Sequence, residues 1–169
     1  ILTDIFQFGM FGVDIFFVIS GFVMVSVTRG KFQIQKQALK FIYHRAARIY
    51  PTYWFYTMLV LLVFLIQPSW VNSSQGSQVD ILSSFLLLPS PTLPLVMVGW
   101  TLVHEMYFYI MFFIILLLIP ERHMPLTIII WGVSISLLNN FLTLNNPIIN
   151  LVTHPLTLEF IGGCLLAII

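Results

Sequence analysis

Long apolar stretches alternate with short polar connections along the chain. A helix needs about 20 predominantly apolar residues to cross the roughly 30 Å hydrocarbon core of a bilayer. Stretches near that length occur four times, and a fifth runs to the last residue. The pattern therefore predicts an all-α integral membrane protein, a polytopic helical bundle with about five transmembrane helices. These helices are predicted at 11–27, 49–66, 100–119, 126–142 and from about 156 onward.

The connections between these helices differ in character. Residues 28–48 are basic, and Lys36, Lys40 and His44 follow helical spacing. This spacing predicts a short amphipathic helix at the level of the lipid headgroups. The remaining connections are expected to be polar loops or turns, at 67–80, 120–125 and 143–155.

Residues 81–98 decide the topology. They begin as an apolar run too short to span, which three prolines then interrupt, and we favour a re-entrant or surface segment. In that case Asp14 and Glu105 both lie near the outer ends of their helices. If the segment spans instead, Glu105 falls in the cytoplasmic half, nearer Arg45 and Arg48.

The composition predicts a membrane protein, and the distribution of charge predicts its orientation in the membrane. Of its 169 residues 59% are hydrophobic and 8% are charged, whereas soluble domains carry about 25% charged residues. Six of the seven basic residues fall within 29–48, with no acid among them. Because short basic loops stay in the cytoplasm, we predict a multi-pass protein of the inner (plasma) membrane with residues 28–48 cytoplasmic. No Cys/His spacing suggests a metal, and we expect no bound cofactor and no nucleic-acid partner.

Glu105 is the first candidate for chemistry, because it lies in an otherwise uncharged stretch within a predicted spanning helix. A carboxylate is costly there, which makes it a functional-site hypothesis. It would accept a proton or orient a catalytic base or a substrate hydroxyl; alternatively, it is a structural carboxylate paired elsewhere in the bundle. Tyr109 lies one turn later on the same helix face and is expected to share its network. His104 points about 100° away and is expected at an interface.

Asp14 is a weaker candidate. It is expected to begin a helix after two glycines, where a carboxylate is favoured by the positive end of the helix dipole. That placement and a functional role are equally consistent with the sequence.

Arg45 and Arg48 lie three residues apart and so share a helix face. Together with Lys36 and Lys40 they could bind a phosphorylated cytoplasmic co-substrate, since arginine suits phosphates. The alternative is that these residues only hold orientation and contact anionic membrane lipids.

Four segments together resemble one enzyme family, the membrane acyltransferase family three, which includes O-antigen and exopolysaccharide O-acyltransferases. The segment at 100–109 resembles the family's Trp-Ser-Leu motif with its downstream Glu and Phe-Tyr, and its Thr101 variant is most similar to the exopolysaccharide-production branch. The four segments are 12–22 (GVDIFFVISGF), 41–54 (FIYHRAARIYPTYW), 100–109 (WTLVHEMYFY) and 158–163 (LEFIGG).

The resemblance implies an integral membrane enzyme of roughly ten helices. Such an enzyme moves an acyl group, usually acetyl, from acetyl-CoA to a hydroxyl of a polysaccharide or lipid-linked glycan. On this basis Arg45, Arg48 and, more weakly, Lys40 would meet the acyl donor, and Trp100, Thr101 and Tyr109 would shape the site around Glu105. Asp14 would anchor its helix or join an outer network.

The resemblance also implies a catalytic His in a first helix, which we expect upstream of Ile1. Residues 1–169 are therefore expected to be a partial transmembrane domain, without its first and C-terminal helices and inactive alone. Two other function classes remain open. A transporter or flippase of lipid-linked glycans would use Glu105 in a substrate path, and a non-catalytic membrane scaffold would tolerate its replacement.

Overall fold

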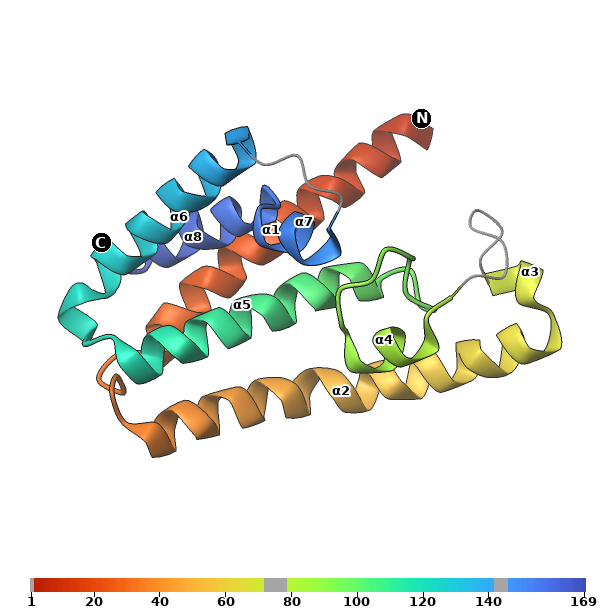
Figure 1. Cartoon of the computed structure of the whole chain (residues 1–169), viewed down its shortest axis with the longest axis horizontal. Coiled ribbons are helices and arrows are strands. Elements are labelled where there is room, and N and C mark those ends of the chain that lie inside the picture. Colours follow the sequence, from red (N-terminus) through yellow and green to blue (C-terminus); the bar gives the residue numbers. More distant parts are fainter. Residues whose placement is uncertain (1, 72–78, 142–145) are drawn as a thin grey trace.

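The computed structural model describes residues 2–71, 79–141 and 146–169, with side chains over 11–71, 79–139 and 146–169, and every regular element in these ranges is helical. Five longer helices run roughly side by side (Figure 1): α1 (Leu2–Thr28), α2 (Gln35–Ile66), α5 (Gly99–Leu118), α6 (Met124–Phe141) and α8 (Leu156–Leu166). Shorter elements connect them: α3 (Pro68–Val71), α4 (Ile81–Leu86), the 3₁₀ turn η1 (Glu121–His123) and α7 (Pro147–Val152).

Contacts between connections fix the direction of each helix. The Gln33 N–H donates to the Leu116 carbonyl at 2.8 Å, so the end of α5 meets the loop between α1 and α2. The Gly30 N–H donates to Glu121 Oε2 at 2.9 Å, and Arg29 donates to the Ala167 carbonyl. Therefore α1, α5 and α8 run toward this end of the bundle, and α2 and α6 run away from it.

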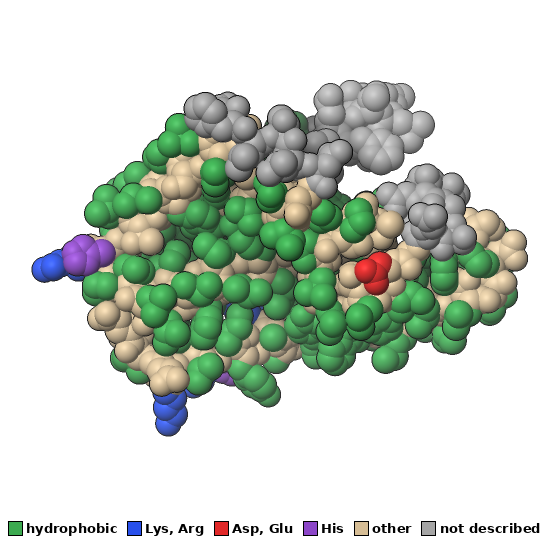
Figure 2. Space-filling model, in the orientation of Figure 1, with side chains coloured by type: hydrophobic (Ala, Val, Ile, Leu, Met, Phe, Trp, Pro, Cys, Tyr) green, Lys and Arg blue, Asp and Glu red, His purple; other side chains and the backbone are tan. Residues whose placement is uncertain are grey.

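We call this end, around residues 29–34 and η1, the basic end. All seven Lys and Arg residues lie in 29–48 or in η1. In Figure 2, hydrophobic side chains cover most of the face in view, and basic side chains protrude at this end. The opposite end, which carries residues 79–98 and 146–155, is called the loop end.

Four helical stretches within the described residues are long and apolar enough to cross a bilayer: Phe11–Thr28, Gln35–Ile66, Gly99–Leu118 and Pro147–Leu166. The helix expected at 126–142 is present as α6, with residue 142 outside the described residues. A fifth span and a domain of about ten helices stay predictions.

The largest correction to the sequence analysis concerns α2. A short amphipathic helix and a separate span from residue 49 were expected, whereas one helix of 32 residues runs through Pro51. Its buried side chains form one stripe that continues on both sides of the proline: Ala38, Phe41, Ile49, Tyr53 and Thr57. Packing of this stripe outweighs the backbone hydrogen bond that a proline removes.

Three further expectations on element boundaries were wrong. Because α1 begins at Leu2, Asp14 lies well inside a helix and gains nothing from a helix N-terminus. The expected loop 143–155 contains α7, and the expected loop 67–80 contains α3; residues 72–78 and 143–145 lie outside the described residues.

Residues 79–98 stay at the loop end, as favoured from the sequence. The α4 helix has only 6 residues, and three aromatic side chains of α2 donate hydrogen bonds to its carbonyls. The Tyr53 hydroxyl binds the Ser84 carbonyl at 2.6 Å. Asp80 caps α4 by accepting hydrogen bonds from the Ser83 hydroxyl and N–H, and these bonds hold the pKa of Asp80 below its usual range.

Helices α1 and α8 approach each other closely enough to exclude any side chain at two glycines. A Cβ placed on Gly163 would lie 1.9 Å from the Val18 carbonyl oxygen, and one on Gly21 would lie 2.1 Å from the Phe160 carbonyl oxygen. Small residues allow membrane helices to pack backbone against backbone in this way. By contrast, a Cβ on Gly162 would meet nothing within 4 Å.

Gly163→Ala in the full-length protein is expected to lower the midpoint of thermal unfolding in detergent, because overpacking costs about 1–3 kcal/mol. Gly162→Ala is the matched control and should leave the midpoint unchanged or raise it, since alanine favours a helix by about 1 kcal/mol over glycine. Equal midpoints for the two variants would contradict the close α1–α8 packing.

Candidate functional site

Glu105 and Tyr109 form a buried pair on α5. Glu105 is 5% exposed and Tyr109 is 1% exposed, and the Tyr109 hydroxyl donates a hydrogen bond to Glu105 Oε1. The two residues are one helical turn apart, which is the spacing at which side chains meet. The contact anticipated from the sequence is therefore present.

Two arginines of α2 lie beside this pair. The Arg45 guanidinium carbon is 5.5 Å from the centre of the Tyr109 ring and 5.6 Å from that of Phe41, within the range of cation–π attraction. Arg45 and Arg48 both lie close enough to Glu105 to interact with its charge. Glu105, Tyr109, Arg45 and Arg48 form one cluster, although the two arginines precede Glu105 by more than 50 positions in sequence.

This cluster corrects one consequence that the sequence analysis drew from the topology, namely the distance between Glu105 and the two arginines. Glu105 lies six residues after the start of α5, about 9 Å from the loop-end side of that helix. Arg45 and Arg48 were expected near it only if residues 81–98 crossed the membrane. They reach it anyway, because the continuous α2 carries them about 15–20 Å inward from its start at Gln35.

A cavity of about 360 Å³ lies at the basic end, between the end of α1, the first half of α2 and the end of α5. Arg45 and Arg48 of the cluster line it, whereas Glu105 and Tyr109 do not. Four cationic side chains line it: Lys31, Lys40, Arg45 and Arg48. The three residues predicted to meet an acyl donor, Lys40, Arg45 and Arg48, are therefore brought together here. Lys36, the fourth basic residue of that prediction, is exposed and is not part of this lining.

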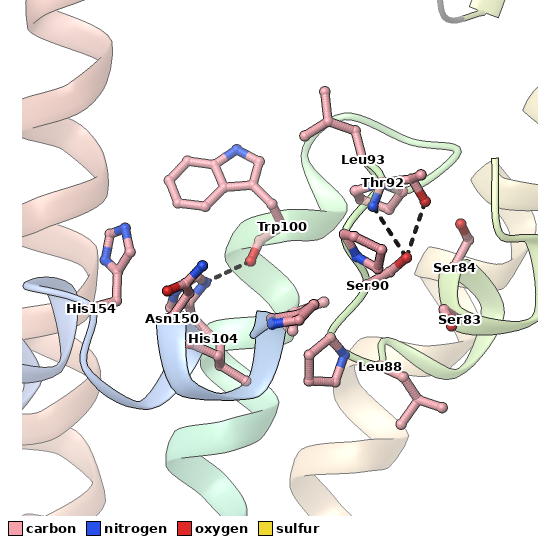
Figure 3. A pocket seen from close by; sticks show the side chains of 16 residues that line it. Ser83, Ser84, Leu88, Ser90, Thr92, Leu93, Trp100, His104, Asn150 and His154 are labelled. Atoms are coloured by element: carbon pink, nitrogen blue, oxygen red, sulfur yellow. Dashed lines mark hydrogen bonds between the residues drawn. The ribbon is translucent and has the colours of Figure 1, made fainter. Parts of the chain in front are cut away.

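A second cavity, of about 570 Å³, lies at the loop end. Trp100, His104, Asn150 and His154 lie along one side of it, and Ser83, Ser84 and Ser90 lie along the other (Figure 3). Trp100 was predicted to shape the site around Glu105, but it lines this second cavity and not the one that contains Arg45 and Arg48. Thr101 does not line the cavity; its hydroxyl donates to the Val98 carbonyl at 2.8 Å.

His104 does not have the interfacial position expected from the sequence. It is 8% exposed, its Nδ1 is 2.9 Å from the Trp100 carbonyl oxygen, and its ring centre is 4.7 Å from that of His154. The turn between α7 and α8 brings His154 to this position. Sequence periodicity could not reveal the pairing, because it depends on contact between elements 50 residues apart.

Asp14 of α1 lies close enough to Glu159 of α8 for the two carboxyl groups to interact electrostatically. Glu159 was missed in the sequence analysis, although it lies in a quoted family segment. Among the described residues no group of three His, Cys, Asp or Glu side chains could hold a metal ion.

Comparison with known proteins gives a consistent assignment. A family model described as an acyltransferase domain matches residues 1–169. The exopolysaccharide production protein ExoZ of Rhizobium meliloti (strain 1021) is 30% identical over 171 residues, which cover 95% of this chain and 51% of the relative. The chain therefore spans about half the length of this curated relative. No solved structure matches the chain.

Tyr109→Phe is expected to destabilise the full-length protein by about 1–3 kcal/mol, because it removes a hydrogen-bond donor from a buried carboxyl group. The phenyl ring keeps the contact with Arg45. The measurement is the midpoint of thermal unfolding in detergent, with Tyr56→Phe as the control, since Tyr56 is 55% exposed. If both variants unfold at the wild-type midpoint, the Tyr109–Glu105 bond does not stabilise the fold.

Proposed function

Because this chain belongs to the acyltransferase domain family, we propose that the protein is a membrane-bound O-acyltransferase that moves an acetyl group from acetyl-CoA to a hydroxyl of an exported polysaccharide. The name of its relative, an exopolysaccharide production protein, supports this class of acceptor. The observation that carries the proposal is the cluster of Glu105, Tyr109, Arg45 and Arg48, whose two arginines also line a cationic cavity.

The basic cavity is the proposed donor site. Acetyl-CoA carries several phosphate groups, and arginine and lysine side chains bind phosphates through charge-assisted hydrogen bonds. Four cations line this cavity, at the end where all the basic residues of the chain gather. A concentration of Lys and Arg favours the cytoplasmic side of the inner membrane, where acetyl-CoA is available.

Glu105 is the proposed proton acceptor, or the group that orients one. In the transfer, the acceptor oxygen forms a bond to the acetyl carbonyl carbon, the carbon–sulfur bond breaks, and the hydroxyl proton passes to a base while coenzyme A leaves as its thiolate. A carboxylate held by Tyr109 and flanked by two guanidinium groups can receive or direct that proton. The same guanidinium groups can stabilise negative charge that develops on the thioester oxygen.

Glu105→Gln is expected to lower acetyl transfer about 100-fold or more, because the amide cannot accept the proton. The assay follows labelled acetyl from acetyl-CoA into glycan, in membranes that contain equal amounts of full-length wild-type protein or variant. Wild-type transfer by Glu105→Gln would exclude the catalytic role. Lack of transfer by the correctly inserted wild type would favour a transporter or flippase.

Arg45→Gln and Arg48→Gln together are expected to raise the KM for acetyl-CoA about 100-fold or more, because each removes a charge-assisted hydrogen bond worth about 1.5–3 kcal/mol. Lys36→Gln is the matched control, since it removes a charge from the same helix outside the cavity lining. Similar KM values in all three proteins would place the donor elsewhere.

A further inference from the structure

The loop-end cavity has the features of a binding site for a neutral polar ligand. Its volume of about 570 Å³ lies within the range of small-molecule sites. Hydroxyl, amide, imidazole and indole groups supply its polar lining, and none of the described lining residues is Lys, Arg, Asp or Glu. A charged ligand would lose its hydration there without gaining a counter-charge. The cationic cavity at the other end has the opposite character.

Trp100 and His104 offer the two kinds of contact that a sugar ring requires. The indole of Trp100 is 36% exposed and lies at the cavity, so it can cover the apolar face of a ring. Asn150, on α7 and exposed, also lines the cavity (Figure 3) and can donate and accept hydrogen bonds.

His104 provides an unused acceptor. The Trp100 carbonyl can only accept, so His104 Nδ1 carries the hydrogen of that 2.9 Å bond and Nε2 of the neutral ring carries a lone pair. Nε2 is enclosed and has no hydrogen-bond partner among the described residues. Buried polar atoms are nearly always satisfied, so a hydroxyl donor at this position would complete the site.

We infer that the loop-end cavity, with Trp100 as ring platform and His104 Nε2 as hydroxyl acceptor, binds an uncharged sugar unit of the glycan. This inference rests on the proposed acyltransferase function for its choice of ligand. The cavity holds a recognition unit of the glycan, and the acceptor hydroxyl itself has to reach the acetyl group beside Glu105. His104 lines the sugar cavity, and Glu105, the next residue, faces the arginines.

The test distinguishes loss of the hydrogen-bond acceptor at His104 Nε2 from loss of the whole imidazole ring. His104→Asn keeps an amide near the Nδ1 position and removes the acceptor, whereas His104→Gln keeps an acceptor near the Nε2 position. The probe is an oligosaccharide obtained by alkaline de-O-acetylation of the producing strain's own exopolysaccharide. Binding to the full-length protein is measured by titration calorimetry without acetyl-CoA, and the KM values for oligosaccharide and acetyl-CoA are measured separately.

We expect His104→Asn to weaken oligosaccharide binding about 3- to 10-fold, as for loss of one neutral hydrogen bond, with the KM for acetyl-CoA unchanged. His104→Gln should recover part of the loss, and Trp100→Leu should weaken binding further. Wild-type binding should change little with ionic strength, unlike binding of acetyl-CoA. His123→Asn, an exposed histidine at the basic end, is the control and should leave both constants unchanged.

The outcomes distinguish the two proposals. If the wild type transfers acetyl and His104→Asn binds the oligosaccharide normally, the sugar site is wrong and the enzymatic proposal stands. If the wild type binds oligosaccharide through His104 but transfers no acetyl, the sugar site stands and the enzymatic proposal fails. Absence of oligosaccharide binding by the wild type also overturns the sugar site.

Discussion

The architecture depends on the direct backbone contact between α1 and α8 at Gly21 and Gly163. In a bilayer, lipid tails compete with side chains for apolar contact, so helices associate where close packing is possible. This contact brings Phe17 and Phe160 against Phe108 of α5. The centre of the Phe108 ring lies 5.3 Å from that of Phe17 and 4.5 Å from that of Phe160, on which it is stacked. The aromatic layer sets the rotation of α5, and that rotation directs His104 toward one cavity and Glu105 toward the other.

The α5 helix therefore has residues facing two cavities of different chemistry. On one face of α5, a carboxyl group and a phenol meet two guanidinium groups that also line a cationic cavity. On the other, an indole and an imidazole border a cavity whose described lining is uncharged. A ligand bound in either cavity would therefore be held by groups of matching polarity.

Local patterns in the sequence were sufficient for the parts that depend on one helix. The i, i+4 spacing of Glu105 and Tyr109 predicted their contact, and the three-residue spacing of Arg45 and Arg48 predicted a shared face. The positions and lengths of the apolar stretches were sufficient to predict most of the helices. What could not be predicted was the depth at which α2 meets α5, because it depends on α2 continuing through Pro51. The pairs Asp14–Glu159 and His104–His154 also depend on packing between distant segments, so no local sequence pattern could predict them.

The way in which α4 is anchored determines which of its residues can be substituted. Tyr50, Tyr53 and Trp54 hold α4 through the carbonyls of residues 84–86 and not through their side chains. Any amino acid supplies such a carbonyl, so the side chains of this segment can be replaced without releasing it from α2. The loop end thus combines a fixed backbone position with side chains that can vary, so the lining of its cavity can change while the helices beneath remain in register.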